Sequence, residues 1–283
     1  MGFNNPIVPW REIERALSDR PRPSDRRNRG NYYSHAPDGA NGGDSPAWSP
    51  RRAVYEPPVR LERRASATPY AELHCHSSFS FLDGASQPEE LAEEAVRAGL
   101  EALALTDHDG FYGVVRFSEA AKAVGLPTVF GSELSLGPTA LENGMGSPAA
   151  PRQGEADPEG IHLVVLARNP RGYGSLSSTI SLGQMAGVEK GKPDYASVDW
   201  SGTHGGDWLV LTGCRKGPLA RALLAEGPAA AGYRLDRLIE VFGRDNVAVE
   251  LWDHGDPLDA VRNDGLAALA VGRGVAVVAT GNV

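Results

Sequence analysis

The chain has 283 residues, 41% hydrophobic and 23% charged, which is enough to bury a sizeable core. Its net charge of -8 is unevenly distributed along the chain. Residues 1–69 hold 12 Arg and 8 acidic residues (net +4), whereas residues 70–283 hold 16 basic and 28 acidic residues (net -12). The negative charge of residues 70–283 disfavours non-specific binding of nucleic acid by this part. The chain has two cysteines, no apolar run of about 18 residues and no signal-peptide pattern. These features exclude a secreted disulfide scaffold and a membrane partner, so we expect a cytoplasmic protein.

The first 69 residues are rich in Arg, Pro and Gly, a composition that buries little apolar surface. We expect an irregular N-terminal arm with one short helix at Trp10–Leu17. Its arginines are compatible with a nucleic-acid contact, but a solvated linker is the favoured interpretation. The folded domain is predicted to span residues 70–283.

From residue 70 onward, short apolar runs alternate with helical patterns. The predicted strands are Ala71–His74, Ala102–Thr106, Thr128–Gly131, His162–Ala167, Trp208–Thr212, Val247–Leu251 and Val275–Thr280. The predicted helices are Gln87–Ala98, Tyr112–Val124, Gly172–Met185, Pro218–Ala225, Ala229–Phe242 and Pro257–Val271.

The clearest helix is the first one. Ser86 is its predicted N-cap, Pro88 lies in its first turn, Glu89 completes a capping box and Gly99 ends it. Further along the chain, the Gly/Pro-rich residues 136–160 predict a surface loop or hairpin.

Alternation of strands and helices predicts an α/β fold with a parallel sheet, open or closed. Seven units favour an incomplete, TIM-like (β/α) barrel over a Rossmann fold, and no G-x-G-x-x-G follows the first strand. In such barrels the active site lies at the carboxyl ends of the strands.

Possible metal ligands follow most of these strand ends. His74 and His76 share one face of an extended segment, so both imidazoles can point into the same space. The residues at strand ends are His74, His76 and Asp83 after the first strand, Asp107, His108 and Asp109 after the second, Glu133 after the third, Cys214 after the fifth and Asn282 after the seventh.

Each of these residues alone favours an ordinary structural role, such as a turn histidine or a buried cysteine. Their joint placement favours a metal site, because imidazole, carboxylate and thiolate groups are its usual ligands. His162 does not fit, since it begins its predicted strand: either that strand runs differently or the side chain reaches the site another way. Of the other histidines, His35 and His204 are expected to be surface or structural, and His254 is the best candidate for an exception.

The ordered series of motifs resembles the PHP (polymerase and histidinol phosphatase) domain, as found in bacterial C-family DNA polymerases. The resemblance covers about residues 70–283. The motifs that carry it are ELHCHSSFSFLDG at 72–84, ALTDHDG at 104–110, GSEL at 131–134, HLVVLARN at 162–169, LTGCRKGPL at 211–219 and VVATGN at 277–282. The arm, with GGDSPAWS and YEPP, is similar to the N-terminal extension of the error-prone branch of that class.

The resemblance implies a distorted seven-unit barrel that binds up to three divalent ions, zinc or manganese. It implies one ion held by His74 and His76, a second by His162 and Cys214, a third by Asp83 and His108, and Glu133 as a bridge between two ions. Asn282 stands where the family has Asp, and a neutral amide is a weaker ligand.

The implied chemistry is phosphoester hydrolysis by a metal-activated water, with no protein nucleophile and with Asp107 and Asp109 orienting the imidazoles. Because the last motif is incomplete, we expect an N-terminal fragment of a longer DNA-directed DNA polymerase for replication and translesion repair. Its PHP domain would have reduced 3′-5′ exonuclease activity. DNA would bind through the missing polymerase domains, and replisome or mutasome proteins would be partners.

Two alternatives remain open. One is a stand-alone PHP phosphatase that acts on a small phosphate monoester, against which the Cys214 motif and the long arm argue. The other is a non-catalytic, metal-stabilised scaffold. Metal content measured together with hydrolysis separates the scaffold from the enzymes.

Overall fold

The computed structural model describes residues 55–64, 68–81, 83–137, 160–188 and 191–283. The predicted helix Trp10–Leu17, most of the predicted arm and most of the Gly/Pro-rich stretch 136–160 lie outside these ranges. The compact unit that contains the sheet begins at Pro57.

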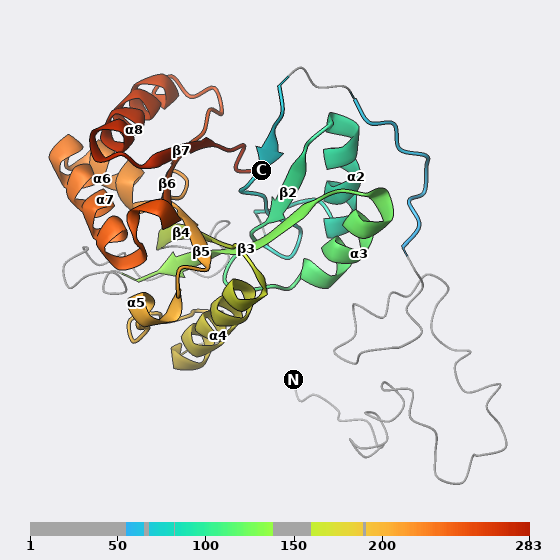
Figure 1. Ribbon diagram of the computed structural model, residues 1–283, viewed down its shortest axis with the longest axis horizontal. Coiled ribbons are helices and arrows are strands. Elements are labelled where there is room, and N and C mark those ends of the chain that lie inside the picture. Colours follow the sequence, from blue (N-terminus) through green and yellow to red (C-terminus); the bar gives the residue numbers. More distant parts are fainter. Residues whose placement is uncertain (1–54, 65–67, 82, 138–159, 189–190) are drawn as a thin grey trace, which may run out of the picture. The chain divides into compact units, whose positions relative to one another are not determined.

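Seven strands of the described residues form one sheet, in which their order is their order in the chain. They are β1 (Ala71–Glu72), β2 (Ala102–Leu105), β3 (Thr128–Leu136), β4 (Ile161–Ala167), β5 (Trp208–Leu211), β6 (Val247–Leu251) and β7 (Ala276–Ala279). The predicted incomplete α/β barrel is confirmed, because the curled sheet brings its two edge strands back toward each other (Figure 1).

Helices cover the outside of this sheet in two main groups. They are α2 (Pro88–Ala98), α3 (Val114–Val124), α4 (Pro170–Ala186), α5 (Trp200–Thr203), α6 (Pro218–Ala225), α7 (Pro228–Phe242) and α8 (Asp259–Arg273), with a 3-10 turn, η2, at Arg244–Asn246. Helices α2 and α3 pack together beside β2 and β3, whereas α6, α7 and α8 form the second group beside β6 (Figure 1).

The predicted parallel sheet is correct for four of the six strand pairs and wrong for β4. β4 runs antiparallel to both of its neighbours, with Leu136 opposite Ile161 at the start of the β3–β4 pair. The beginning of β4 therefore lies at the edge where the parallel strands end. This reversal resolves the position of His162, which the sequence left open.

β3 is longer than predicted because it has two partners in succession. Residues 128–130 pair with β2 in parallel, and residues 131–136 continue as the antiparallel partner of β4. Glu133 therefore lies inside a strand and not after its end. The ends of the other predicted strands and helices agree with the structure within two residues, and α5 was not predicted.

Alternation along the strands separates an inner face from an outer face. In β4, Leu163 and Val165 pack against the outer helices, whereas Val164 and Leu166 join the small core inside the barrel. Even-numbered residues of β4 thus face inward. His162, the second residue of β4, also lies on this inner face.

The N-terminus of α2 differs by one residue from its prediction. The N-cap is Gln87, whose backbone N–H donates to Glu90 Oε2 at 2.8 Å, so Glu90 takes the place predicted for Glu89. Pro88 occupies the first helical position, where its missing N–H costs nothing, and it favours the extended conformation (ψ 152°) of Gln87. Gly99 ends the helix in the left-handed conformation as predicted.

Segments that follow the two edge strands close the seam between β7 and β1. The Val283 N–H donates to the His74 carbonyl at 3.2 Å, and the His76 N–H donates to the Val283 carbonyl at 2.6 Å. The Gly281 N–H donates to Glu72 Oε2 at 2.6 Å. These bonds bring the first predicted motif beside the last one.

Candidate metal centre

One buried carboxylate, Glu133, lies among four imidazoles. Its Oε2 is 3.1 Å from His76 Nε2 and 3.3 Å from His108 Nδ1, and its Oε1 is 3.4 Å from His74 Nε2 and 3.3 Å from His162 Nδ1. The Glu133 side chain is 1% exposed. The structure therefore brings together histidines that follow β1 and β2 and one from the start of β4 around a residue of β3.

The side chains form three overlapping groups, in each of which the possible ligand atoms lie within 4.8 Å of one another. The groups are His74, His76 and Glu133; His76, Asp83 and His108; and His108, Glu133 and His162. Each group supplies three N or O atoms at a spacing that one cation could bridge.

Asp83 forms the most exposed part of the cluster. Its Oδ2 lies 3.0 Å from His108 Nε2 and 3.3 Å from His76 Nδ1, and its side chain is 31% exposed. The hydrogen bond from His108, together with the nearby His76, holds the pKa of the Asp83 carboxyl below its usual range. The carboxylate is therefore ionised at neutral pH and available to a cation.

Cys214 lies beside His162 and Glu133. Its Sγ is 3.8 Å from Glu133 Oε1 and 4.0 Å from His162 Nδ1. The preceding Gly213 has a φ of +79°, and a Cβ at this position would lie 2.3 Å from the His162 carbonyl oxygen. Only glycine allows the β5–α6 loop to approach β4 closely enough to present the thiol here.

Asp107 bonds to two serines of the segment that follows His76. Its carboxylate accepts hydrogen bonds from the Ser77 N–H at 2.8 Å, from the Ser77 hydroxyl and from the Ser80 hydroxyl at 2.8 Å. Ser80 in turn accepts the His108 N–H at 3.1 Å. Asp107 thus fixes the loop that joins His76 to Asp83, and it affects the imidazoles only through the backbone.

Asp109 also binds other partners. Its Oδ1 accepts the Tyr195 hydroxyl at 2.9 Å and the Ser135 N–H at 2.9 Å, and its backbone has a φ of +47°. These bonds connect the loop after β2 to β3 and to the segment after α4. The position of His108 against Glu133 depends on this connection.

Glu250 and Glu72 are polar residues of the centre that the sequence analysis missed. Glu250 Oε1 lies 2.6 Å from His74 Nδ1 and accepts the Thr280 hydroxyl at 2.6 Å. Glu72 Oε1 accepts the His74 N–H at 2.8 Å. In the sequence, Glu250 is the single carboxylate in the apolar run of β6, and this feature could have marked it. It lies on the same inward-facing side of the strand as Ala248.

Asn282 lies in the seam beside His74, with a φ of +48°. Its neighbours Gly281 and Val283 bond to Glu72 and to the His74 backbone. His254 was the expected exception among the remaining histidines. Its Nε2 atom lies 2.6 Å from the Gly281 carbonyl oxygen. His254 therefore contacts the seam and belongs to none of the three groups.

Neighbouring charges set the protonation of the inner residues. Burial disfavours the charged imidazole of His74, but Glu250 and Glu133 outweigh it and raise the pKa of His74 well above its usual value. Glu133 likewise raises the pKa of His162 against the effect of burial. Burial opposes the ionised form of Glu133, but His162 and His74 hold its pKa well below the usual range. The centre thus favours a carboxylate surrounded by positive charge.

Unpaired nitrogen atoms show that these residues fit a cation. His74 Nε2, His76 Nε2 and His108 Nδ1 are buried and have no hydrogen-bond partner among the described residues. Buried polar atoms are nearly always paired in folded proteins. Three imidazole nitrogens that point at one carboxylate match the ligand set of zinc or manganese.

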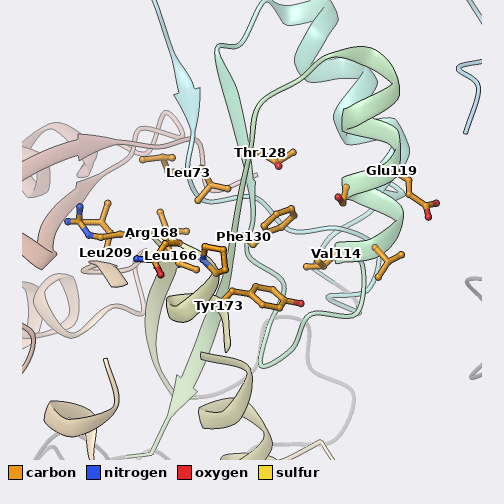
Figure 2. Close-up of a pocket in the computed structure, with 15 residues that line it drawn as sticks. Leu73, Val114, Glu119, Thr128, Phe130, Leu166, Arg168, Tyr173 and Leu209 are labelled. Carbon is orange, nitrogen blue, oxygen red and sulfur yellow. The ribbon is translucent and has the colours of Figure 1, made fainter. Parts of the chain in front are cut away.

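A separate cavity of about 830 Å³ lies away from this centre, on the side of the sheet between α3 and α4 (Figure 2). Its walls are mostly apolar and include Leu73, Phe130, Leu166 and Tyr173. None of its lining residues belongs to the three groups of possible ligands. It therefore adds nothing to the metal centre.

Comparisons with known proteins agree with this architecture. The family model described as "PHP domain" matches residues 72–254. The chain is 49% identical over 280 residues to the error-prone DNA polymerase of Mycolicibacterium paratuberculosis and 47% identical over 313 residues to that of Nocardia farcinica. Each alignment covers 99% of this chain, but the chain spans only 24% and 26% of the length of these relatives.

Among solved structures, one similar chain is a two-domain protein of Bacteroides vulgatus that contains a predicted PHP-like metal-dependent phosphoesterase. It has 16% sequence identity and a TM-score of 0.44, over 80% of this chain and 57% of the other. Within the part of the chain that the structure describes, no helix is long and apolar enough to cross a membrane.

Proposed function

Since this chain belongs to the PHP domain family, we propose that its strand-end centre binds divalent ions, zinc or manganese and up to three of them, and hydrolyses phosphoester bonds. The observation that carries the proposal is the convergence of four imidazoles on the buried Glu133. Three of these ring nitrogens are buried without a hydrogen-bond partner among the described residues, which supports a cation between them and Glu133.

The proposed ligands are His74, His76, Asp83, His108, Glu133, His162 and Cys214, with Asn282 as a weaker one. When bound, divalent ions lower the pKa of a water molecule and stabilise negative charge on phosphoester oxygens. The protein's own contribution is to hold the imidazoles and carboxylates in place. Glu250 and Glu72 fix His74, and Asp107 fixes the loop between His76 and Asp83.

We further propose that the chain is the PHP domain of an error-prone DNA polymerase, which acts on DNA in the cytoplasm. Near-complete coverage of this chain by relatives of that name supports the assignment. The substrate bond would then be a 3′-terminal DNA phosphodiester. Water adds to phosphorus, the bond to the 3′ oxygen of the preceding nucleotide breaks, that oxygen takes a proton, and a nucleoside 5′-monophosphate leaves.

The neutral Asn282 supports a reduced rate of this hydrolysis, because an amide offsets none of a cation's charge. Replication and translesion repair, with replisome or mutasome proteins as partners, would be tasks of the longer polypeptide. The acidic balance of residues 70–283 supports DNA binding by other domains of that polypeptide.

The test combines metal analysis with a DNA substrate. The purified chain is loaded with Mn²⁺ or Zn²⁺, its bound metal is measured, and it is incubated with DNA that carries a 3′ mispair. We expect bound metal and slow release of nucleoside monophosphate, and we expect both to be lost in His74→Ala. Nucleotide release that survives His74→Ala would contradict the assignment of the site.

One observation favours the alternative of a metal-stabilised scaffold. Glu133 and the side chains around it come from four separate parts of the sheet, so a bound cation would tie these parts together. Metal bound at full occupancy with no hydrolysis of either mispaired DNA or a small phosphate monoester would select the scaffold. Hydrolysis of the monoester alone would select a small-molecule phosphatase.

A further inference from the structure

Glu250, on the inner face of β6, has a carboxylate that is not among the proposed metal ligands. Glu250 is fully buried, and Oε1 makes two short contacts, to His74 Nδ1 and from the Thr280 hydroxyl, both at 2.6 Å. Its backbone N–H donates to the Thr212 hydroxyl at 3.0 Å. The side chain is thus held in position by β5, by the segment after β7 and by the imidazole itself.

His74 uses its two ring nitrogens for different purposes. Nδ1 faces Glu250, whereas Nε2 is buried without a hydrogen-bond partner and lies 3.4 Å from Glu133 Oε1. A carboxylate at Nδ1 keeps a proton on that nitrogen and leaves the lone pair of Nε2 free for a cation. The same contact fixes the rotation of the ring.

We propose that Glu250 is a positioning residue that holds His74 in the Nδ1–H form and orients its Nε2 toward the centre. A carboxylate behind a ligating histidine raises the basicity of the imidazole, and loss of such a partner typically weakens metal affinity about 10- to 100-fold. Glu250 itself touches no substrate and is not a catalytic residue. The inference rests on the proposed metal binding.

Glu89 provides a control outside the centre. It is also a buried glutamate, but it belongs to α2, and its Oε1 accepts a hydrogen bond from Arg116 Nε at 2.6 Å. Glu89→Gln therefore replaces a buried carboxylate by an amide without changing the partner of the His74 ring. Glu250→Gln keeps the size of the side chain and replaces the carboxylate by an amide, which can donate to Nδ1 and favour the other tautomer.

The experiment measures Zn²⁺ affinity of the full chain by competition with a chelator, together with the melting temperature of each metal-free protein. We expect Glu250→Gln to bind Zn²⁺ about 10- to 100-fold more weakly than the wild type. Glu89→Gln should stay within about threefold of the wild type, because the His74 ring keeps its partner. In the Zn²⁺-loaded wild type, the ¹⁵N spectrum should show His74 protonated at Nδ1.

Three results would overturn the inference. One is Zn²⁺ affinity in Glu250→Gln equal to that of the wild type. Another is an equal loss of affinity in Glu89→Gln, which would assign the effect to the loss of any buried carboxylate. The third is His74 bound through Nδ1 in the ¹⁵N spectrum. A wild-type chain that binds neither Zn²⁺ nor Mn²⁺ would overturn the proposed function as well, so the two failures are distinguishable.

Discussion

Glu133 places one negative charge among four imidazoles inside the domain. An isolated buried carboxylate would cost several kcal/mol of desolvation, so it needs positive charge nearby. The imidazoles of His74 and His162, whose pKa values are raised, supply positive charge, and bound cations would take its place. Loss of the Glu133 carboxylate is therefore expected to lower metal affinity more than it lowers the stability of the metal-free fold.

At the residue scale, Glu133→Gln should lower Zn²⁺ affinity by at least about tenfold, because a neutral amide replaces the central anionic ligand. The melting temperature of the metal-free protein should change much less, since the amide also removes the buried negative charge that the imidazoles offset. Chelator competition and thermal unfolding check both parts. Glu226→Gln, at an exposed glutamate of the α6 cap, serves as the control. Wild-type affinity in Glu133→Gln would contradict the assigned site.

Gly213 gives a second prediction at this scale. Gly213→Ala forces a Cβ to within 2.3 Å of the His162 carbonyl oxygen, at a φ of +79°. We expect a loss of about 2 kcal/mol or more in the free energy of unfolding, measured by urea denaturation. Gly174→Ala on α4, where a Cβ meets nothing within 4 Å, should instead stabilise by up to about 1 kcal/mol. Equal effects of the two variants would show that the close approach to β4 is not required.

At the scale of elements, the sequence predicted most of the fold because alternation and capping are local signals. The direction of β4 was not predictable, because Ile161–Ala167 carries the same apolar pattern whichever way the strand runs. The position of His162 followed only once that direction was known. Glu250 was missed for a related reason: its partner His74 is 176 residues away, and no local pattern marks the pair.

The start of α8 illustrates an element that orders a loop. Asp259 accepts the His254 N–H at 2.8 Å and the Asp256 N–H at 3.1 Å, and its Oδ1 lies 2.6 Å from Arg262 Nη1. The Arg262 guanidinium stacks on the Trp252 ring at 3.8 Å. Together these contacts hold the loop after β6, from which His254 reaches the seam.

Asp259→Asn should therefore lower the melting temperature at pH 7. Burial favours the neutral acid, but the two N–H groups and Arg262 hold the pKa of Asp259 below its usual value. A lowered pKa stabilises the fold at pH values above the unfolded-state pKa of about 3.9, and this stabilisation is lost as the pH falls through the folded-state pKa. The difference in melting temperature between wild type and variant should shrink below about pH 4, as measured by circular dichroism. A constant difference from pH 7 to pH 3 would rule out the ionised carboxylate as its source.

At the scale of the whole molecule, few bonds close the barrel. β1 contains only two residues, and its junction with the segment after β7 consists of the backbone bonds of Val283 to His74 and His76 and the bond of Gly281 to Glu72. The same junction carries the first two possible ligands. Closure of the sheet and assembly of the metal centre are therefore one structural event.

Removal of residues 281–283 should lower the free energy of unfolding by about 2–4 kcal/mol, because four hydrogen bonds at about 1 kcal/mol each are lost, among them the bond of His254 to the Gly281 carbonyl. It should also weaken Zn²⁺ binding, since the His74 backbone loses its partner. Denaturant unfolding and chelator competition measure the two effects. Val283→Ala keeps the backbone bonds and shortens a side chain that is 63% exposed, so it should behave like the wild type. Wild-type stability of the shortened chain would show that the seam does not depend on these bonds.

The separation of its two halves along the chain determines when the seam can form during translation. Glu72 and Gly281 are 209 residues apart, so at translation rates of roughly 5–20 residues per second the first motif waits about 10–40 s for its partner. During that interval the backbone bonds of Val283 to His74 and His76 cannot yet form. Capture of metal by this domain should thus come late, after the last strand has left the ribosome, and ions met earlier on the ribosome should bind only weakly.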